Sequence, residues 1–85
     1  MTGPGIERCD VVIDFMDMTA GRRVWVRPVD VRSGVTVAVG GHLVVCDDDA
    51  DPQVARVVAV DIDGVIELEV LPGSVESHRN LLTSA

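Results

Sequence analysis

The sequence predicts an all-β fold: a small five-stranded, partly open barrel followed by a short C-terminal helix. The 85 residues suffice for one domain with a small core, and 47% of them are hydrophobic. Eighteen are valine, whereas one phenylalanine, one tryptophan and no tyrosine are present. The core must therefore be aliphatic and β-branched, which favours strands. Several segments also alternate apolar and polar residues between Gly- and Asp-containing turns, as half-buried strands do.

The chain divides simply. We expect a flexible, Gly- and Pro-containing leader at residues 1–8 and a single barrel domain at residues 9–82, which includes a short tail helix at residues 74–82. Ser74 is the expected N-cap of this helix. Because two helical turns are unstable alone in water, its apolar side chains must dock on the barrel or on a partner. These side chains are Val75, Leu81 and Leu82.

Two segments near the N-terminus are expected to pair as a hairpin. Residues 9–16 alternate apolar side chains with Asp10 and Asp14, and residues 22–28 alternate Val24 and Val26 with larger polar or aromatic residues. The segment between them contains a Gly turn. A proline at position 28 cannot donate to a sheet, so it ends the second strand or places that strand at a sheet edge.

Residues 35–46 are apolar on both faces and contain Gly40-Gly41, which predicts a central strand that bends sharply. Such a bend would let a small sheet curl closed. A flat sheet would leave one apolar face bare, so closure is the expected solution.

The last hairpin has a register that its pattern selects. A three-residue loop, Ile62-Asp63-Gly64, pairs Val60 with Ile66 and Val58 with Leu68, and it keeps the acids of the second strand on the other face. A two-residue loop would place those acids beside large aliphatic residues. The longer loop also gives Gly64 the left-handed position that a type I turn with a bulge requires.

The run from Val37 to Gly73 is similar to Src-homology-3-like small barrels, including the KOW and Tudor types. It contains a turn glycine, a strand, an acidic loop, a strand and an Asp-Gly hairpin, in that order. The resemblance implies a module that binds peptides, proteins or RNA and catalyses no reaction. The aromatic cluster that many such barrels use for peptides is absent, since Phe15 and Trp25 are the only aromatic residues.

The acidic loop CDDDADP has two interpretations. Asp47, Asp49 and Asp51 match the first three ligand positions of an EF-hand, but Pro52 and Val58 stand where that motif needs glycine and a bidentate acid. The flanking segments are predicted strands, whereas an EF-hand has helices. We therefore expect a solvated turn whose charges keep a valine-rich edge soluble, and no calcium site.

No other metal site or catalytic motif is predicted. His42 and Cys46 share a strand face but lie about 13 Å apart at ~3.3 Å per residue, too far for one zinc ion, and neither Cys9 nor His78 has paired ligand spacing. No catalytic nucleophile turn or phosphate-binding Gly-rich loop is present. We expect no cofactor and no enzymatic activity.

The chain lacks an apolar stretch of membrane-spanning length and an evident signal peptide, so we expect a cytoplasmic protein with Cys9 and Cys46 reduced and buried. A disulfide is the less favoured alternative. All seven basic residues are arginine, which is typical of GC-rich coding sequences, and we expect a bacterial source.

One candidate binding patch remains on the second predicted strand. Trp25 should point outward between arginines, either as a stacking platform or as a cover for the barrel end or the docked tail. The patch consists of Arg22, Arg23, Trp25 and Arg27. Eight acids lie between Asp47 and Glu69 with only Arg56 among them, and the net charge is −7.

This charge distribution favours a protein partner over nucleic acid or a membrane. The expected function is protein–protein interaction, and self-association as a homo-oligomer is one form that it can take. The alternative is RNA or single-stranded DNA binding through the arginine and tryptophan patch.

Overall fold

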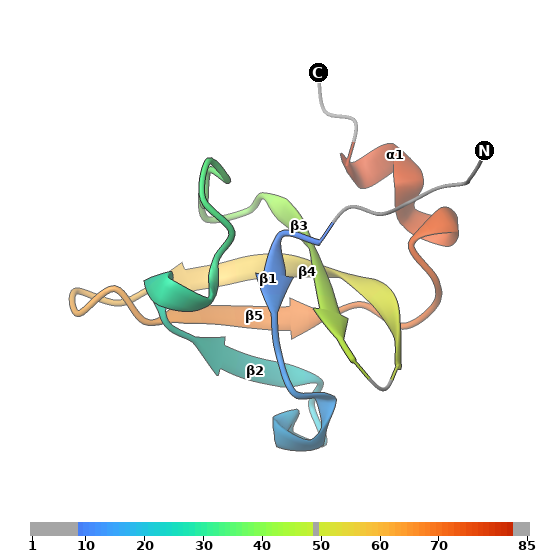
Figure 1. Ribbon diagram of the computed structural model, residues 1–85, viewed down its shortest axis with the longest axis horizontal. Helices are drawn as coiled ribbons and strands as arrows, with labels where there is room; N and C mark the ends of the chain where they lie inside the picture. The colour runs from blue at the N-terminus through green and yellow to red at the C-terminus, as the bar shows by residue number, and fades with distance from the viewer. Residues whose placement is uncertain (1–8, 49, 83–85) are drawn as a thin grey trace.

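A computed structural model describes residues 9–48 and 50–82. The predicted leader at residues 1–8 lies outside the described residues. The described chain contains five strands and four short helical segments (Figure 1). In chain order they are β1 Val11–Val12, the 3-10 turn η1 Phe15–Asp17, β2 Arg23–Val26, η2 Pro28–Asp30, β3 His42–Asp47, β4 Ala50–Val60, β5 Ile66–Val70, η3 Glu76–His78 and α1 Arg79–Leu82.

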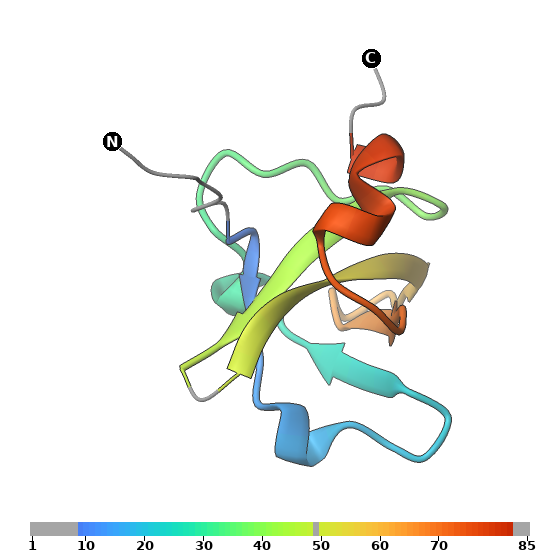
Figure 2. The same cartoon turned by 90° about the vertical axis from the view of Figure 1, so that its right-hand side faces the viewer.

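The five strands form one mixed sheet in the order β1-β3-β4-β5-β2. β1 runs parallel to β3, and the other neighbours are antiparallel. The sheet curls so that its edge strands, β1 and β2, lie on the same open side of the molecule (Figures 1 and 2). The predicted all-β, partly open five-stranded barrel is confirmed in this form, together with the short C-terminal helix.

The concave face of the curled sheet carries the core. β5 shows why: Ile66, Leu68 and Val70 are buried, while the two glutamates between them are half-exposed. Burying an aliphatic side chain of this size contributes roughly 1.5 to 3 kcal/mol. The fully buried members of this core cluster are Val11, Val45, Ala55, Val57, Leu68 and Val70. Val44 and Val54 are also fully buried, but they lie outside the cluster. A valine-rich core of this kind explains the near absence of aromatic residues.

The β4–β5 hairpin confirms most of the predicted register. Val60 pairs with Ile66, and Gly64 has a φ of +89°, as the three-residue loop requires. The prediction for Val58 is wrong, because the register shifts between Val57 and Ala59 and Val57 pairs with Leu68. This β-bulge keeps the fully buried Val57 on the core side.

The predicted hairpin between residues 9–16 and 22–28 is wrong. β1 pairs with β3, and β2 pairs with β5 at the opposite edge of the sheet. The first strand ends early because the Asp14 carboxylate accepts the Met16 N–H at 2.9 Å and starts η1, while the Phe15 N–H donates to Asp47 at 2.8 Å. These bonds turn the chain away before it can pair with β2.

The predicted bent central strand over residues 35–46 is also shorter than expected, because only His42–Asp47 is a strand. Gly40, with a φ of +88°, donates its N–H to Val57 at 2.9 Å, and Gly41 donates to Ala38 at 2.8 Å. The glycine pair therefore forms a turn at which the strand begins. Val35 and Val37 still pack against the core from the preceding loop.

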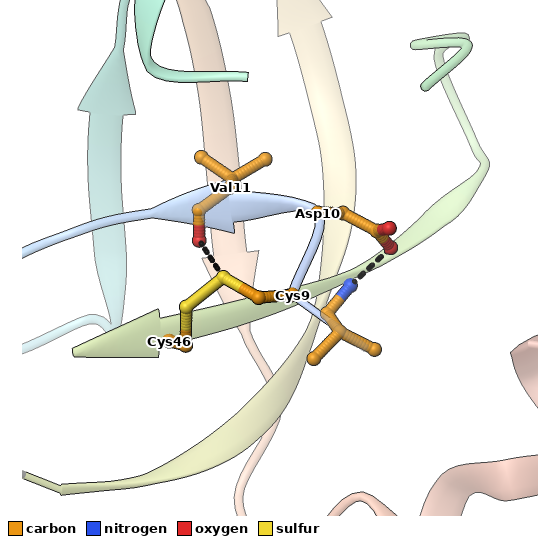
Figure 3. The surroundings of a disulfide bond; sticks show 5 residues. Cys9, Asp10, Val11 and Cys46 are labelled. Atoms are coloured by element: carbon orange, nitrogen blue, oxygen red, sulfur yellow. Dashed lines mark hydrogen bonds between the residues drawn. A yellow bond between two sulfur atoms is a disulfide. The ribbon is translucent and has the colours of Figure 1, made fainter. Parts of the chain in front are cut away.

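The prediction that both cysteines are reduced is wrong. Cys9 and Cys46 form a disulfide (Figure 3). The physical reason is the parallel pairing of β1 with β3, which brings the two Cα atoms to 5.9 Å, within the usual range for a disulfide. Beside it, the buried Asp10 accepts the Val44 N–H at 2.9 Å. Both interactions fasten β1 to β3. Disulfides persist mainly in oxidising compartments, so the disulfide gives no support to the predicted cytoplasmic location, which stays a prediction.

The tail follows the prediction closely. The helical segment begins one residue later than expected, because its N-cap is Val75, but the Ser74 hydroxyl accepts the Ser77 N–H at 3.2 Å as a capping side chain does. The two short segments η3 and α1 continue as one helical tail, and Leu81 and Leu82 line a hollow with Leu43 and Val57 of the sheet. Leu81 and Leu82 thus lie beside the sheet, where the prediction that so short a helix docks its apolar side chains on the barrel places them.

Candidate functional site

The candidate site is centred on Trp25, in the middle of the edge strand β2. Val24 and Val26 are 4% and 5% exposed and belong to the core, whereas Trp25 is 53% exposed. The outward orientation of Trp25 agrees with the alternation in the sequence. Edge strands with a large exposed aromatic side chain are common elements of binding surfaces.

Arg22, the first residue of the predicted patch, is engaged within the fold. Its Nε donates to the Val70 carbonyl at 2.7 Å, and its Nη2 donates to the Gln53 side chain at 2.9 Å. Nη2 also lies 3.4 Å from the Leu71 carbonyl. Three oxygens from β4, β5 and the following residue thus hold this guanidinium at the end of the sheet.

Arg23 and Arg27 differ from each other. Arg23 forms an ion pair with Glu67 of β5, next to Trp25 on the convex face of the sheet. Arg27 is exposed, and its backbone N–H donates to the Asp30 carboxylate at 3.0 Å at the start of η2. The predicted arginines therefore lie near Trp25 along the chain, but two of the three are already committed to partners within the protein.

The convex face around β5 has its charges balanced in cross-strand pairs. Besides the Arg23 pair, Arg56 of β4 lies 2.9 Å from Glu69. The hydrogen bond from Arg56 lowers the pKa of the Glu69 carboxyl below its usual value, and the nearby charges of Arg56 and Arg23 act in the same direction, although desolvation opposes them. The arginines of this region are thus used to neutralise the glutamates of β5.

Trp25 forms the ridge between two hollows. The convex hollow, about 260 Å³ in volume, is lined by Trp25, Ala59, Asp61, Val65 and Glu67. The seam hollow, about 290 Å³, is lined by residues of both edge strands. Its lining consists of Val12, Ile13, Asp14, Asp17, Val24, Trp25, Val26 and Asp30.

Carboxylates dominate the polar lining of the seam hollow. Asp14 and Asp30 each accept one backbone N–H, from Met16 and Arg27. Within residues 9–48 and 50–82, neither of these acids nor Asp17 forms an ion pair. Three carboxylates for which the described residues supply no ion pair therefore border an apolar floor and an indole ring. This hollow is suited to a positively charged ligand with an apolar part.

The backbone of β2 adds hydrogen-bonding groups to the same seam. The Val70 N–H donates to the Arg22 carbonyl at 2.8 Å. In an antiparallel pair the backbone groups alternate, so the N–H and C=O of Val24 and Val26 also point toward β5. The N–H and C=O of Arg23 and Trp25 point away from β5. On that outer side, the Arg23 N–H donates to the Thr19 hydroxyl, and the Arg23 carbonyl accepts the Thr19 N–H. In the described part of the chain, no partner is found for the outward N–H and C=O of Trp25.

The acidic loop of the sequence follows β3. Asp47 accepts the Phe15 N–H and so helps to fix η1, and Asp49 lies outside the described residues. Of the possible zinc ligands, Cys9 and Cys46 are joined in the disulfide, and His78 Nε2 lies 2.7 Å from the Pro72 carbonyl oxygen. Among the described residues, no group of three or more acidic, histidine or cysteine side chains is arranged to hold a metal ion.

Comparison of the chain with protein-family models, curated proteins and solved structures found no match. None of the described helices is long and apolar enough to cross a membrane. The site must therefore be interpreted from its own geometry.

The sequence identified Trp25 but not its acidic neighbours. Asp14 is the N-cap of η1 and Asp17 its last residue, at one end of the seam, and Asp30 comes from η2 at the other. A signal was present, because both acids of η1 and the acid of η2 lie within about a dozen residues of Trp25 in the sequence. The predicted patch instead consisted of Trp25 and the arginines beside it in the chain.

Proposed function

We propose that this chain is a non-catalytic binding module that holds a positively charged segment of a partner protein against Trp25. The observation that carries the proposal is the seam hollow, where three carboxylates without an ion pair among the described residues surround a half-exposed indole. A partner arginine or lysine meets here both a negative field and an aromatic face.

Arginine is the better ligand of the two. Its planar guanidinium stacks on an indole and can donate in parallel to a carboxylate, whereas the lysine ammonium is a strongly hydrated point charge. Asp17 can accept with both carboxylate oxygens, and Asp14 and Asp30, which each accept one backbone N–H, keep further lone pairs for a second donor. The aliphatic stem of the arginine would cover Val12, which is exposed.

The free backbone groups of Trp25 suit a partner in extended conformation. One residue of such a segment can exchange a pair of hydrogen bonds with the outward N–H and C=O of Trp25, in the manner of a short added strand. The addition must be short because Thr19 already bonds Arg23 on one side and η2 begins beyond Arg27 on the other.

The finer assignment to Src-homology-3-like barrels belongs to the same proposal. The curled five-stranded sheet and the hairpin order from Val37 to Gly73 support it. The resemblance implies binding without catalysis. A single tryptophan flanked by acids replaces the aromatic cluster, so we expect recognition by charge with one aromatic anchor.

Nucleic-acid binding remains the alternative outcome of the test. It would use Arg23, Trp25 and Arg27, with the guanidinium of Arg22 held away in the fold. A net charge of −7 and the carboxylates beside Trp25 oppose the approach of phosphates.

The test is calorimetric titration with a short peptide that alternates arginine and valine, and separately with a single-stranded oligonucleotide. We expect the peptide to bind and the oligonucleotide not to bind. Trp25→Ala should weaken peptide binding by at least about 30-fold, as loss of a hot spot of ~2 kcal/mol does. Val39→Ala truncates an exposed apolar side chain that does not line the seam hollow. It is the matched control and should bind the peptide like the wild type. Binding of the oligonucleotide in preference to the peptide would favour the alternative.

A second variant separates charge recognition from aromatic contact. Asp17→Asn keeps the shape of the seam hollow and removes one of its charges. We expect Asp17→Asn to reduce the affinity for the peptide more at low salt than at high salt, because salt already screens the attraction that the substitution removes. Equal binding by wild type and Asp17→Asn at low salt would contradict recognition by the acidic seam.

A further inference from the structure

A second apolar surface lies at the end of the barrel where the β4–β5 hairpin projects (Figure 1). Ile62 at the tip is 95% exposed, and Val29 of η2 and Val60 of β4 are also exposed. Beside them lies the end hollow, about 430 Å³ in volume. It is lined by Pro28, Val31, Arg32, Ser33, Val35, Val37, Val60, Gly64 and Ile66. Isolated exposed aliphatic residues are ordinary, but here they border an apolar hollow.

The tip that carries Ile62 is held firmly. The Gly64 N–H donates to the Asp61 carbonyl at 2.9 Å, and the Asp61 N–H donates to Val65 at 2.8 Å. Gly64 also lies so close to Pro28 that an added Cβ would come within 3.1 Å of its ring. The hairpin is therefore braced against η2, and little conformational entropy would be lost if Ile62 were inserted into a partner.

The tip and the end hollow have opposite charges. Ile62 is flanked by Asp61 and Asp63, and the charged residue of the hollow's lining is Arg32. In residues 9–48 and 50–82 no ion pair of Arg32 or Asp63 is found. An apolar projection with adjacent acids thus lies next to an apolar hollow with an adjacent base.

We propose that this end of the barrel binds a second copy of the same chain about a two-fold axis. Each copy inserts Ile62 into the end hollow of the other, and Asp63 of one copy pairs with Arg32 of the other. A two-fold interface requires that projection and hollow belong to the same surface, as they do here. The proposal uses other residues than the proposed function, because no residue that lines the seam hollow also lines the end hollow.

The dimer should be weak. One hairpin tip and one hollow per copy make an interface at the small end of the range for specific complexes, for which micromolar affinity is expected. The net charge of −7 on each copy opposes association, but salt of about 0.15 M screens charges farther apart than ~8 Å. The close Asp63–Arg32 contacts would be screened less.

The experiment is sedimentation equilibrium over about 10 to 500 µM protein, a range that brackets a micromolar dissociation constant. We expect a monomer–dimer equilibrium for the wild type. Ile62→Ser should shift it toward monomer by at least about tenfold in dissociation constant, as loss of a buried aliphatic side chain predicts. Val39→Ser makes the same kind of change at an exposed valine that does not line the end hollow, and it should leave the equilibrium unchanged.

A charge exchange makes the test specific for this arrangement. Asp63→Arg and Arg32→Asp should each weaken the dimer, because each places like charges together. The double variant should restore it, and a mixture of the two single variants should form heterodimers. Both residues lie on the surface, so the variants should fold, and far-ultraviolet circular dichroism checks this.

Three results would overturn the proposal: a wild type that is monomeric throughout, a dimer unaffected by Ile62→Ser, or no restoration in the double variant. Trp25→Ala should leave the dimer intact. Dimerisation lost only in Trp25→Ala would instead place self-association on the seam, so failure of this proposal is distinguishable from failure of the proposed function.

Discussion

The disulfide between Cys9 and Cys46 should supply a large part of the stability of this domain. The two cysteines are 37 residues apart in the chain. Closing a loop of that length lowers the entropy of the unfolded chain by an amount that corresponds to about 4 kcal/mol at 25 °C. A domain of 85 residues has a total stability of only roughly 4 to 13 kcal/mol. Replacing both cysteines by serine should therefore leave a marginally folded protein.

The assay is urea unfolding followed by far-ultraviolet circular dichroism, with and without a reductant. With a urea slope of about 1.0 to 1.5 kcal/mol/M for a protein of this size, a loss of ~4 kcal/mol lowers the midpoint by roughly 3 M. The reduced wild type and the Cys9→Ser, Cys46→Ser double variant should unfold at similar urea concentrations. The double variant should not respond to reductant. Free thiols in the unreduced wild type, or a midpoint that reductant leaves unchanged, would refute the reasoning.

Three further predictions concern backbone, charge and the candidate site. Gly64→Ala should destabilise the domain by about 1 kcal/mol or more, because alanine is strained at the φ of +89° found there, whereas Gly21→Ala, without a positive φ, should cost less in the same urea assay. The lowered pKa of Glu69 contributes stability at pH values above its ordinary 4.5, and this contribution is lost as the pH falls through the lower folded pKa. Glu69→Gln should therefore make unfolding less sensitive to acidification below pH 4.5, and an unchanged pH profile would contradict the contribution of its pair with Arg56. Trp25→Ala should cost at most about 2 kcal/mol of unfolding free energy, since Trp25 is 53% exposed, and a loss near the ~4 kcal/mol of a core aromatic would show that it serves the core.

The sequence predicted the faces of the strands better than their partners. Alternation in β5 and β2 correctly separated buried from exposed side chains, including the outward position of Trp25. The same alternation is satisfied whichever strand lies alongside, so it could not show that β2 pairs with β5 and that β1 pairs with β3. Those choices depend on the turns at Asp14 and Gly40, where local hydrogen bonds redirect the chain.

The predictions of the cysteines' redox state and of the charge around the candidate site were wrong for a related reason. Both depend on which distant segments meet. Cys9 and Cys46 come together only through the parallel pairing, and the acids around Trp25 gather because η1 and η2 lie at the two ends of the open seam. Arg22 was expected at the surface beside Trp25, but carbonyl oxygens at the sheet end bind its guanidinium. Nearness in the chain was therefore a poor guide to nearness in space.

The most direct test of the central claim is the fluorescence of Trp25 during titration with an arginine-valine peptide. Trp25 is the sole tryptophan of the chain, so its emission reports on the candidate site itself. The control peptide replaces each arginine by citrulline, which has nearly the same shape but no charge. The proposed recognition by acids and indole predicts a saturable change in emission with the arginine peptide and a much weaker response to the citrulline peptide. An equal response to both peptides, or no response to either, would contradict it.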